Sequence, residues 1–352
     1  MTRLIHTGII GFGLSGKVFH APFIHTHPGF HLAAIVERHH QLSKKVYPYV
    51  SVVEDYHDLL HDDSLELIVV ATPNTLHFPM ARDCMLAGKH VVIEKPFTPS
   101  TAEAEELIGI SLETGKKIFV YQNRRWDGDF LTIRKLIEEE ALGKIEYYEA
   151  HFDRYSPELK SNAWRDEDIP GGGILYDLGS HLIDQALTLF GMPDAVRAEI
   201  LKERPGTEVD DSFDLELFYP DKKIRLVAGM MVKKPGPRYI VEGTEADFVK
   251  YGIDPQEAFL KEGVMPDLEN WGQDDRTLHG KLIFQDNGEQ KEKNIETLNG
   301  NYMAFYDNVF ESLVKNNNSA VTAEEARNVI FIIEKAFESS RNNRVITINN
   351  EQ

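Results

Sequence analysis

A histidine and two carboxylates recur at helical spacing in the middle of the chain. Asp177, His181 and Asp184 follow a run of three glycines, residues 171–173. Residues four and seven positions apart on an α-helix share one face, so the three side chains are expected to project together. A histidine titrates near neutral pH and can take a proton from a substrate hydroxyl. The competing interpretation is a core histidine that is hydrogen-bonded by Asp177 or Asp184.

A glycine pattern near the start of the chain predicts a phosphate-binding turn. It fits G-x-G-x-x-G and directly follows an apolar run, residues 5–10, that is typical of a strand. The first glycine permits a tight turn, the second lets the backbone approach a pyrophosphate, and the third allows close helix–strand packing. A turn without a ligand is the alternative. The expected dinucleotide-binding residues here are Gly11, Phe12, Gly13, Leu14, Ser15 and Gly16.

An acidic residue and an arginine follow the second predicted strand. Glu37 lies 21 residues after Gly16, where a carboxylate can accept hydrogen bonds from the adenosine ribose and favour NAD. Arg38 comes next and can pair with the 2′-phosphate of NADP. Both side chains also suit a solvated turn. The sequence therefore favours NAD and leaves NADP open.

A lysine stands where another predicted strand ends. Lys95 lies between Glu94 and Pro96, after an apolar run at residues 90–94. Open α/β sheets bind ligands at the carboxyl edge of their strands, so Lys95 is placed to contact a reacting oxygen or the nicotinamide ribose. A surface lysine beside a turn is the other interpretation. The Lys95–Pro96 bond is a candidate cis peptide.

The elements that position these residues fall into two domains. In the first third, short apolar runs alternate with helical patterns, which predicts parallel βαβ units and a doubly wound Rossmann sheet. One of the helices begins at a Ser100/Glu103 capping box and ends at Gly115. The expected strands are residues 5–10, 32–36, 51–53, 67–71, 90–94 and 117–121.

Beyond residue 122 the pattern changes to α+β. Strand-like segments follow one another from residue 196 to 244 without intervening helices, which predicts a large mixed, mostly antiparallel sheet. The expected helices are residues 127–140, 174–190, 302–315 and 323–341, the last opened by a Thr322/Glu325 capping box. We thus expect an α/β protein with a Rossmann domain at 1–122 and a substrate-binding and oligomerisation domain at 123–352. The last helices are able to pack back on the Rossmann domain.

Composition narrows the function classes. A net charge of −19 opposes binding to nucleic acid or to an anionic membrane. No apolar run is as long as a membrane span and the first residues do not resemble a signal peptide, so we expect neither. Cys84 is the single cysteine among 352 residues, which favours a cytoplasmic protein. Four histidines crowd near the glycine turn, but cysteines are lacking there and carboxylates are few, so we expect solvated or packed imidazoles and no metal site. These histidines are His20, His25, His27 and His31, and His20 is the one that we expect close to the cofactor.

Two motifs together are similar to one enzyme family. Glu94-Lys95-Pro96 and the later Gly-Gly-Gly-x-x-x-Asp-x-Gly-x-His resemble the glucose–fructose oxidoreductase/inositol dehydrogenase/MocA (Gfo/Idh/MocA) family over essentially the whole chain. Segments 122–127 and 248–254 resemble its scyllo-inositol dehydrogenase-like members. The resemblance implies an NAD(P)-dependent oxidoreductase that moves a hydride between nicotinamide and a secondary hydroxyl or ketone of a cyclic polyol or sugar. It also implies a homodimer or larger homo-oligomer, because the family's C-terminal sheet commonly forms a subunit interface.

The same resemblance implies roles for individual residues. Lys95 and His181 would be the catalytic pair, with Asp177 hydrogen-bonded to the substrate hydroxyl and to His181. Glu37 departs from the pattern, because the NADP-using members generally lack an acidic residue there. Residues implied to line the cofactor are Thr72, Pro73, Asn74, His77, Glu94, Lys95 and Asn123. Residues implied to approach the substrate are Tyr155, Trp164, Arg165, Asp177 and His181.

Two other functions fit the same fold. Some members of the family hydrolyse glycosides with transiently used NAD, which predicts tightly retained cofactor without net reduction. Others are regulators that sense a nucleotide. Regulators can lose the catalytic lysine, and this chain keeps Lys95, Asp177 and His181, so the regulator is the less favoured alternative.

Overall fold

The computed structural model describes residues 3–159 and 167–348, which divide into two units. The first unit contains Met1–Asn123, Gln256–Trp271 and Asn301–Arg327, and the second contains Arg124–Pro255, Gly272–Gly300 and Asn328–Gln352. The chain therefore returns twice from the second unit to the first.

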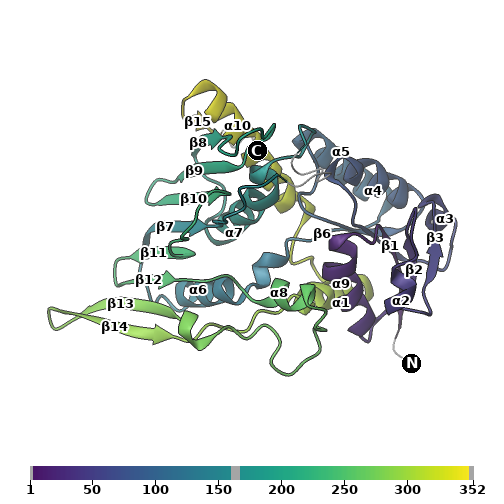
Figure 1. Ribbon diagram of the computed structural model, residues 1–352, viewed down its shortest axis with the longest axis horizontal. Coiled ribbons are helices and arrows are strands. Elements are labelled where there is room, and N and C mark those ends of the chain that lie inside the picture. Colours follow the sequence, from purple (N-terminus) through teal and green to yellow (C-terminus); the bar gives the residue numbers. More distant parts are fainter. Residues whose placement is uncertain (1–2, 160–166, 349–352) are drawn as a thin grey trace. The chain divides into compact units, whose positions relative to one another are not determined.

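Six parallel strands form the sheet of the first unit (Figure 1). Their order, β3-β2-β1-β4-β5-β6, is that of a doubly wound Rossmann sheet, which confirms the prediction. The central strands are almost entirely apolar because helices cover both faces of such a sheet. The strands are β1 (Ile5–Ile10), β2 (Phe30–Val36), β3 (Ser51–Val53), β4 (Leu67–Val70), β5 (His90–Ile93) and β6 (Ile118–Val120).

The helices of this unit are mostly short. Helix α5 has the predicted ends, since the Ser100 side chain accepts a hydrogen bond from the Glu103 N–H and Gly115 is left-handed with φ of 68°. Helix α10 (Ala323–Asn342) begins in this unit and continues into the second. The others are α1 (Ala21–Thr26), α2 (Ser43–Val46), α3 (His57–Leu60), α4 (His77–Leu86), α5 (Thr101–Thr114), α8 (Gln256–Lys261) and α9 (Met303–Lys315), with a 3₁₀ turn η2 (Asn74–Leu76).

The helix after the glycine turn departs from regular geometry. Its first turn, η1 (Gly16–His20), is π-helical, and α1 continues it for only six residues. Pro22 lies in the first turn of α1, where a missing N–H leaves no hydrogen bond unmade. The wider first turn ends at His20, whose side chain is completely buried.

Nine strands form the mixed sheet of the second unit. The order is β14-β13-β12-β11-β7-β10-β9-β8-β15. Among the described strands only the β7–β10 pair is parallel, so the sheet is mixed and mostly antiparallel, as the sequence predicted. The strands are β7 (Ile145–His151), β8 (Ala195–Leu201), β9 (Ser212–Phe218), β10 (Lys223–Gly229), β11 (Tyr239–Gly243), β12 (Ala246–Lys250), β13 (Gly280–Asp286), β14 (Glu289–Ile295) and β15 (Ile346–Thr347). The helical segments are η3 (Asn123–Trp126), α6 (Gly128–Glu138), η5 (Leu175–Gly179), α7 (Ser180–Phe190) and η6 (Arg276–Leu278).

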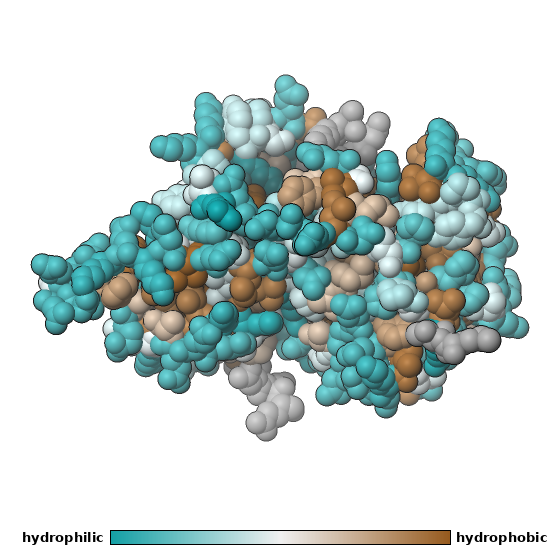
Figure 2. All heavy atoms as spheres, turned by 90° about the horizontal axis from the view of Figure 1, so that it is seen from below, coloured by the Kyte–Doolittle hydropathy of each residue, from teal (hydrophilic) through white to brown (hydrophobic). Residues whose placement is uncertain are grey.

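The β13–β14 hairpin was not expected from the sequence. Asn287 and Gly288 both have positive φ, 54° and 84°, which suits the tight turn that such a dipeptide favours between two strands. Strand β14 is an edge strand with mostly charged and amide side chains, which discourage pairing with another chain. Figure 2 shows hydrophilic residues covering this end of the molecule.

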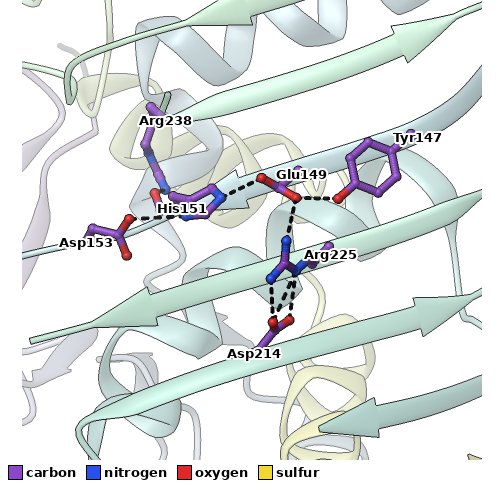
Figure 3. A network of polar contacts seen from close by, with 7 residues as sticks. All are labelled: Tyr147, Glu149, His151, Asp153, Asp214, Arg225 and Arg238. Atoms are coloured by element: carbon purple, nitrogen blue, oxygen red, sulfur yellow. Dashed lines mark hydrogen bonds and ion pairs between the residues drawn. The ribbon is translucent and has the colours of Figure 1, made fainter. Parts of the chain in front are cut away.

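The two faces of the nine-stranded sheet differ in chemistry. On one face Tyr148 packs against Phe190 of α7, with ring centroids 5.4 Å apart, and the Tyr239 hydroxyl donates to Gln185 at 2.9 Å. Alternate residues of β7 point to the other face. There Arg225 of β10 forms an ion-paired fork on Asp214, with Nη2 to Oδ2 at 2.6 Å, and also reaches Glu149 (Figure 3).

His151 lies between two carboxylates in this network (Figure 3). Its Nε2 is 2.7 Å from Glu149 Oε1 and its Nδ1 is 3.2 Å from Asp153 Oδ2. Burial alone would lower the pKa of His151, but the hydrogen bonds to Asp153 and Glu149 and their negative charges outweigh it and raise the pKa. Among the residues described, no helix is long and apolar enough to cross a membrane.

The raised pKa of His151 predicts a pH-dependent contribution to stability. A protonated imidazole pairs with both carboxylates, so the contribution is complete below the ordinary pKa of 6.5 and is lost as pH rises through the higher pKa of the folded protein. Urea unfolding should show the wild type losing up to about 1 kcal/mol more than His151→Gln between about pH 6 and about pH 9. His39→Gln, at an exposed histidine, is the control and should behave like the wild type. Equal pH slopes for wild type and His151→Gln would refute the pairing.

Candidate active site

The glycine turn after β1 has the geometry that a pyrophosphate requires. Gly11 has φ of 96°, and a Cβ there would lie 2.6 Å from the Ala71 carbonyl oxygen. A Cβ on Gly16 would collide with the Gly11 carbonyl. A Cβ on Gly13 would meet no atom within 4 Å, so the open space beside this backbone can admit a ligand closely. The turn thus fits a dinucleotide, with Phe12 packed inward and Leu14 exposed.

Glu37 is engaged by the loop that follows β2. Its two carboxylate oxygens accept the backbone N–H groups of Leu42 and Ser43, each at 2.8 Å. Arg38 beside it is exposed. The carboxylate that the sequence assigned to the ribose is therefore also a support for its own loop, which weakens the argument from Glu37 for NAD.

The segment after β4 is joined to the segment after β5 by a buried histidine. His77 Nε2 is 3.0 Å from the Thr72 carbonyl oxygen, and Nδ1 is 2.9 Å from the Pro96 carbonyl oxygen. Burial lowers the pKa of His77, although hydrogen bonds to these carbonyls partly oppose the effect. Asn74 is buried nearby in the chain, after Pro73. His77 thus holds together two of the turns that carry expected cofactor residues.

Glu94 is the most heavily bonded carboxylate of the first unit's site residues. It accepts hydrogen bonds from the Ser15 hydroxyl, from His20 Nε2 at 2.9 Å and from the Lys95 N–H at 3.0 Å. Burial alone would raise the pKa of Glu94, but the interactions with His20 and Ser15 and the charge of Lys95 lower it to about 2. A charged Glu94 therefore ties the glycine turn to the backbone of Lys95. The Lys95–Pro96 peptide is cis, as expected.

His20 was expected close to the cofactor, but the sequence did not reveal its partners. The sequence groups it with three other histidines as solvated or packed, and the structure shows it buried against Glu94 and Tyr306. The residues next to His20 in the sequence could not have predicted these contacts, because its partner Tyr306 lies 286 positions away.

In the second unit, the triple glycine prepares the helix that carries Asp177 and His181. Gly171 and Gly173 have positive φ, 79° and 89°, and a Cβ on Gly173 would collide with the carboxylate of Asp210. That carboxylate accepts the Leu175 N–H at 2.8 Å and so holds the first helical turn. Burial raises the pKa of Asp210 to about 6, with the Leu175 hydrogen bond acting in the opposite direction. No sequence signal pointed to Asp210.

The helix that carries Asp177, His181 and Asp184 is not regular along its whole length. Residues Leu175–Gly179 form a π-helical turn, so the regular α-helical spacing begins only at Ser180. Asp184 is buried in an ion pair with Arg125, with oxygen–nitrogen distances of 2.7 and 2.8 Å. Its role is to fix α7. His181 is buried and Asp177 is partly exposed.

The remaining expected residues are less constrained. Tyr155 is 52% exposed and forms an isolated β-bridge with Met231. The Lys233 ammonium lies 5.6 Å from the centroid of the Tyr155 ring. Asn123 is buried at the start of η3, three positions after the end of β6. Trp164 and Arg165 lie outside the described residues. Within the described ranges, no group of three or more histidine, cysteine or acidic side chains is arranged to hold a metal ion.

Comparison with known proteins adds independent findings. Residues 5–122 match the Gfo/Idh/MocA "Oxidoreductase family, NAD-binding Rossmann fold", and residues 134–348 match the family's "C-terminal alpha/beta domain". The chain is 42% identical to scyllo-inositol 2-dehydrogenase (NADP(+)) IolW of Bacillus subtilis, over 98% of this chain and 96% of that one. It is 40% identical to the uncharacterized oxidoreductase YdgJ of Escherichia coli, over 99% and 100% of the two chains.

Solved structures agree with this likeness. The oxidoreductase yvaA from Bacillus subtilis superposes with a TM-score of 0.96 at 41% identity, covering 99% of both chains. An oxidoreductase from Yersinia pestis superposes with a TM-score of 0.94 at 38% identity, covering 100% of this chain and 99% of the other.

The contact between Gly173 and Asp210 predicts a position-specific loss of stability. Gly173→Ala should cost about 3 kcal/mol or more, because the methyl group collides with the carboxylate and the backbone is strained as well. Gly115→Ala is the matched control, since Gly115 has φ of 68° but a Cβ there meets nothing within 4 Å. It should cost about 1 kcal/mol from strain alone. Urea unfolding measures both, and equal losses would show that the Asp210 contact is unimportant.

Proposed function

The chain belongs to the Gfo/Idh/MocA oxidoreductase family, and from that premise we propose that it transfers a hydride between NAD(P) and a cyclic polyol or sugar. The observation that carries the proposal is the glycine turn, whose open space beside Gly13 suits a pyrophosphate, in a chain that matches both domains of the family. An inositol is the favoured substrate because a relative 42% identical over nearly the whole chain is named as an inositol dehydrogenase.

The proposed chemistry divides between the dinucleotide and three side chains. The turn from Gly11 to Gly16 would hold the dinucleotide, which supplies the hydride acceptor or donor when bound. In the oxidation direction His181 takes the proton of the substrate hydroxyl, and the C–H hydrogen leaves with its electron pair. The Lys95 ammonium orients the reacting oxygen and stabilises the negative charge that develops on it. Asp177 accepts a hydrogen bond from the substrate hydroxyl and orients His181.

The alternatives make different predictions. A glycoside hydrolase of the same family would retain its dinucleotide and show no net reduction of it. A nucleotide-sensing regulator would bind the dinucleotide and turn nothing over. The presence of Lys95, Asp177 and His181 supports the dehydrogenase over the regulator.

For the cofactor we propose NADP in place of the NAD that the sequence favoured. Both oxygens of Glu37 already accept backbone hydrogen bonds, and the exposed Arg38 beside it can pair with a 2′-phosphate. The relative named as an NADP-dependent inositol dehydrogenase supports the same choice.

We also propose a homodimer or larger homo-oligomer in the cytoplasm. The packed rings and the Gln185–Tyr239 bond lie on one face of the nine-stranded sheet, and the opposite face, with its polar network, would form the subunit contact. Cys84 is the single cysteine and is buried, which suits a reducing compartment.

Activity with inositols tests the main proposal. We expect purified protein to reduce NADP or NAD with an inositol isomer or an aldose, measured by nicotinamide absorbance. Lys95→Ala and His181→Gln should each lower kcat by about 100-fold or more, because each removes a group that acts on the reacting oxygen or its proton. Lys144→Ala, at an exposed lysine, is the control and should keep full activity. Tight dinucleotide binding without turnover would favour the hydrolase or the regulator.

Isothermal titration with NADPH and NADH tests the cofactor proposal. Arg38→Ala should weaken NADPH binding by about 10-fold, the worth of one charge-assisted hydrogen bond to phosphate, and leave NADH binding within about 2-fold. Arg134→Ala, on the exposed side of α6, is the control for a lost surface charge. A wild type that binds NADH more tightly than NADPH would return the choice to NAD.

A further inference from the structure

Behind Glu94 lies a chain of buried hydrogen bonds that the proposed chemistry does not use. The Tyr306 hydroxyl, from α9, is 2.6 Å from His20 Nδ1, and His20 Nε2 is 2.9 Å from Glu94 Oε1. Tyr306 and His20 are completely buried. The ring of Tyr121 packs on the imidazole with centroids 4.4 Å apart. Water therefore does not substitute for either partner.

The chemistry of the three groups sets the direction of the hydrogen bonds. Burial raises the pKa of Tyr306 well above its ordinary value, so its hydroxyl keeps its proton and can donate it. A neutral His20 then accepts at Nδ1, which leaves its ring proton on Nε2. Nε2–H in turn donates to the ionised Glu94. The phenol thus selects the imidazole tautomer that the carboxylate needs.

Glu94 passes this constraint on to two elements of the proposed cofactor site. Its Oε1 also accepts the Ser15 hydroxyl from the glycine turn, and its Oε2 accepts the N–H of Lys95. A carboxylate whose position is fixed from behind by His20 therefore fixes both at once. If the tautomer were reversed, a lone pair of Nε2 would face the carboxylate and push it from this place.

We propose that His20 and Tyr306 are positioning residues that act through Glu94 to hold the Ser15 turn and the Lys95 backbone in the arrangement that binds the dinucleotide. The proposal rests on the proposed function, because it needs the dinucleotide to bind at this turn. It assigns α9, which is remote in the sequence from every expected site residue, a part in cofactor binding.

The test removes one oxygen atom. Tyr306→Phe deletes the donor to His20 and leaves the aromatic packing in place. Long-range ¹H–¹⁵N correlation on histidine-labelled protein, with His20 assigned from a His20→Gln sample, reports the tautomer without cofactor present. We expect Nε2–H in the wild type and a mixture in Tyr306→Phe. Titration calorimetry should show NADPH and NADH binding weakened by about 5- to 10-fold, the cost of one buried hydrogen bond.

Two comparisons separate positioning from a general loss of stability. Tyr148→Phe is the matched control, because Tyr148 is equally buried and its hydroxyl has no hydrogen-bond partner among the described residues. It should leave dinucleotide affinity unchanged. His20→Gln keeps an N–H donor toward Glu94 and should retain most of the affinity, whereas His20→Phe should lose at least as much as Tyr306→Phe.

The outcomes are distinct for the two proposals. If the wild type binds a dinucleotide and Tyr306→Phe binds it equally well, the positioning role is wrong and the proposed function stands. A lowered melting temperature with unchanged affinity would likewise refute the positioning role alone. If the wild type itself binds neither dinucleotide, the proposed function fails, and the positioning role fails with it.

Discussion

The arrangement of the expected cofactor residues in the first unit depends on the buried negative charge of Glu94, which must be hydrogen-bonded. An ionised carboxylate away from water is costly unless hydrogen-bond donors surround it, and Glu94 has three, from Ser15, His20 and Lys95. These donors come from the glycine turn, from a π-helical turn and from the Glu94–Lys95 peptide itself. Loss of the carboxylate would leave all three without an acceptor. The same group that stabilises the unit thus fixes the geometry of the turn that we propose binds the dinucleotide.

The second unit meets the same constraint with different residues. Asp184 is buried and pairs with Arg125, which fixes α7, and Asp210 is buried and holds the Leu175 N–H at the start of η5. Between these two points lie Asp177 and His181. Buried carboxylates on either side of Asp177 and His181 thus hold this helical segment in a fixed orientation, which the base that we propose would need.

Local patterns were sufficient for much of the fold. The glycine turn, the capping box that opens α5 and the alternation of strands and helices depend on residues close in the sequence, so they could be predicted. The β13–β14 hairpin has a readable Asn287-Gly288 turn and was still missed, because β14 carries charged and amide side chains in place of an apolar alternation. The π-helical turn Leu175–Gly179 was missed for another reason. Its local sequence does not distinguish a π turn from a regular α-helical turn.

By itself, then, the sequence determined the Rossmann sheet, the glycine turn and the identity of Lys95, Asp177 and His181 as candidates, since short-range geometry encodes each of them. Only the tertiary structure decided what the buried polar groups do. In the fold Glu37 accepts hydrogen bonds from its own loop, and Asp184 forms an ion pair with Arg125. His20 is hydrogen-bonded to both Glu94 and Tyr306. The physical reason is that a buried charge or donor must find a partner anywhere in the fold. That partner can lie hundreds of residues away, where no spacing rule reaches.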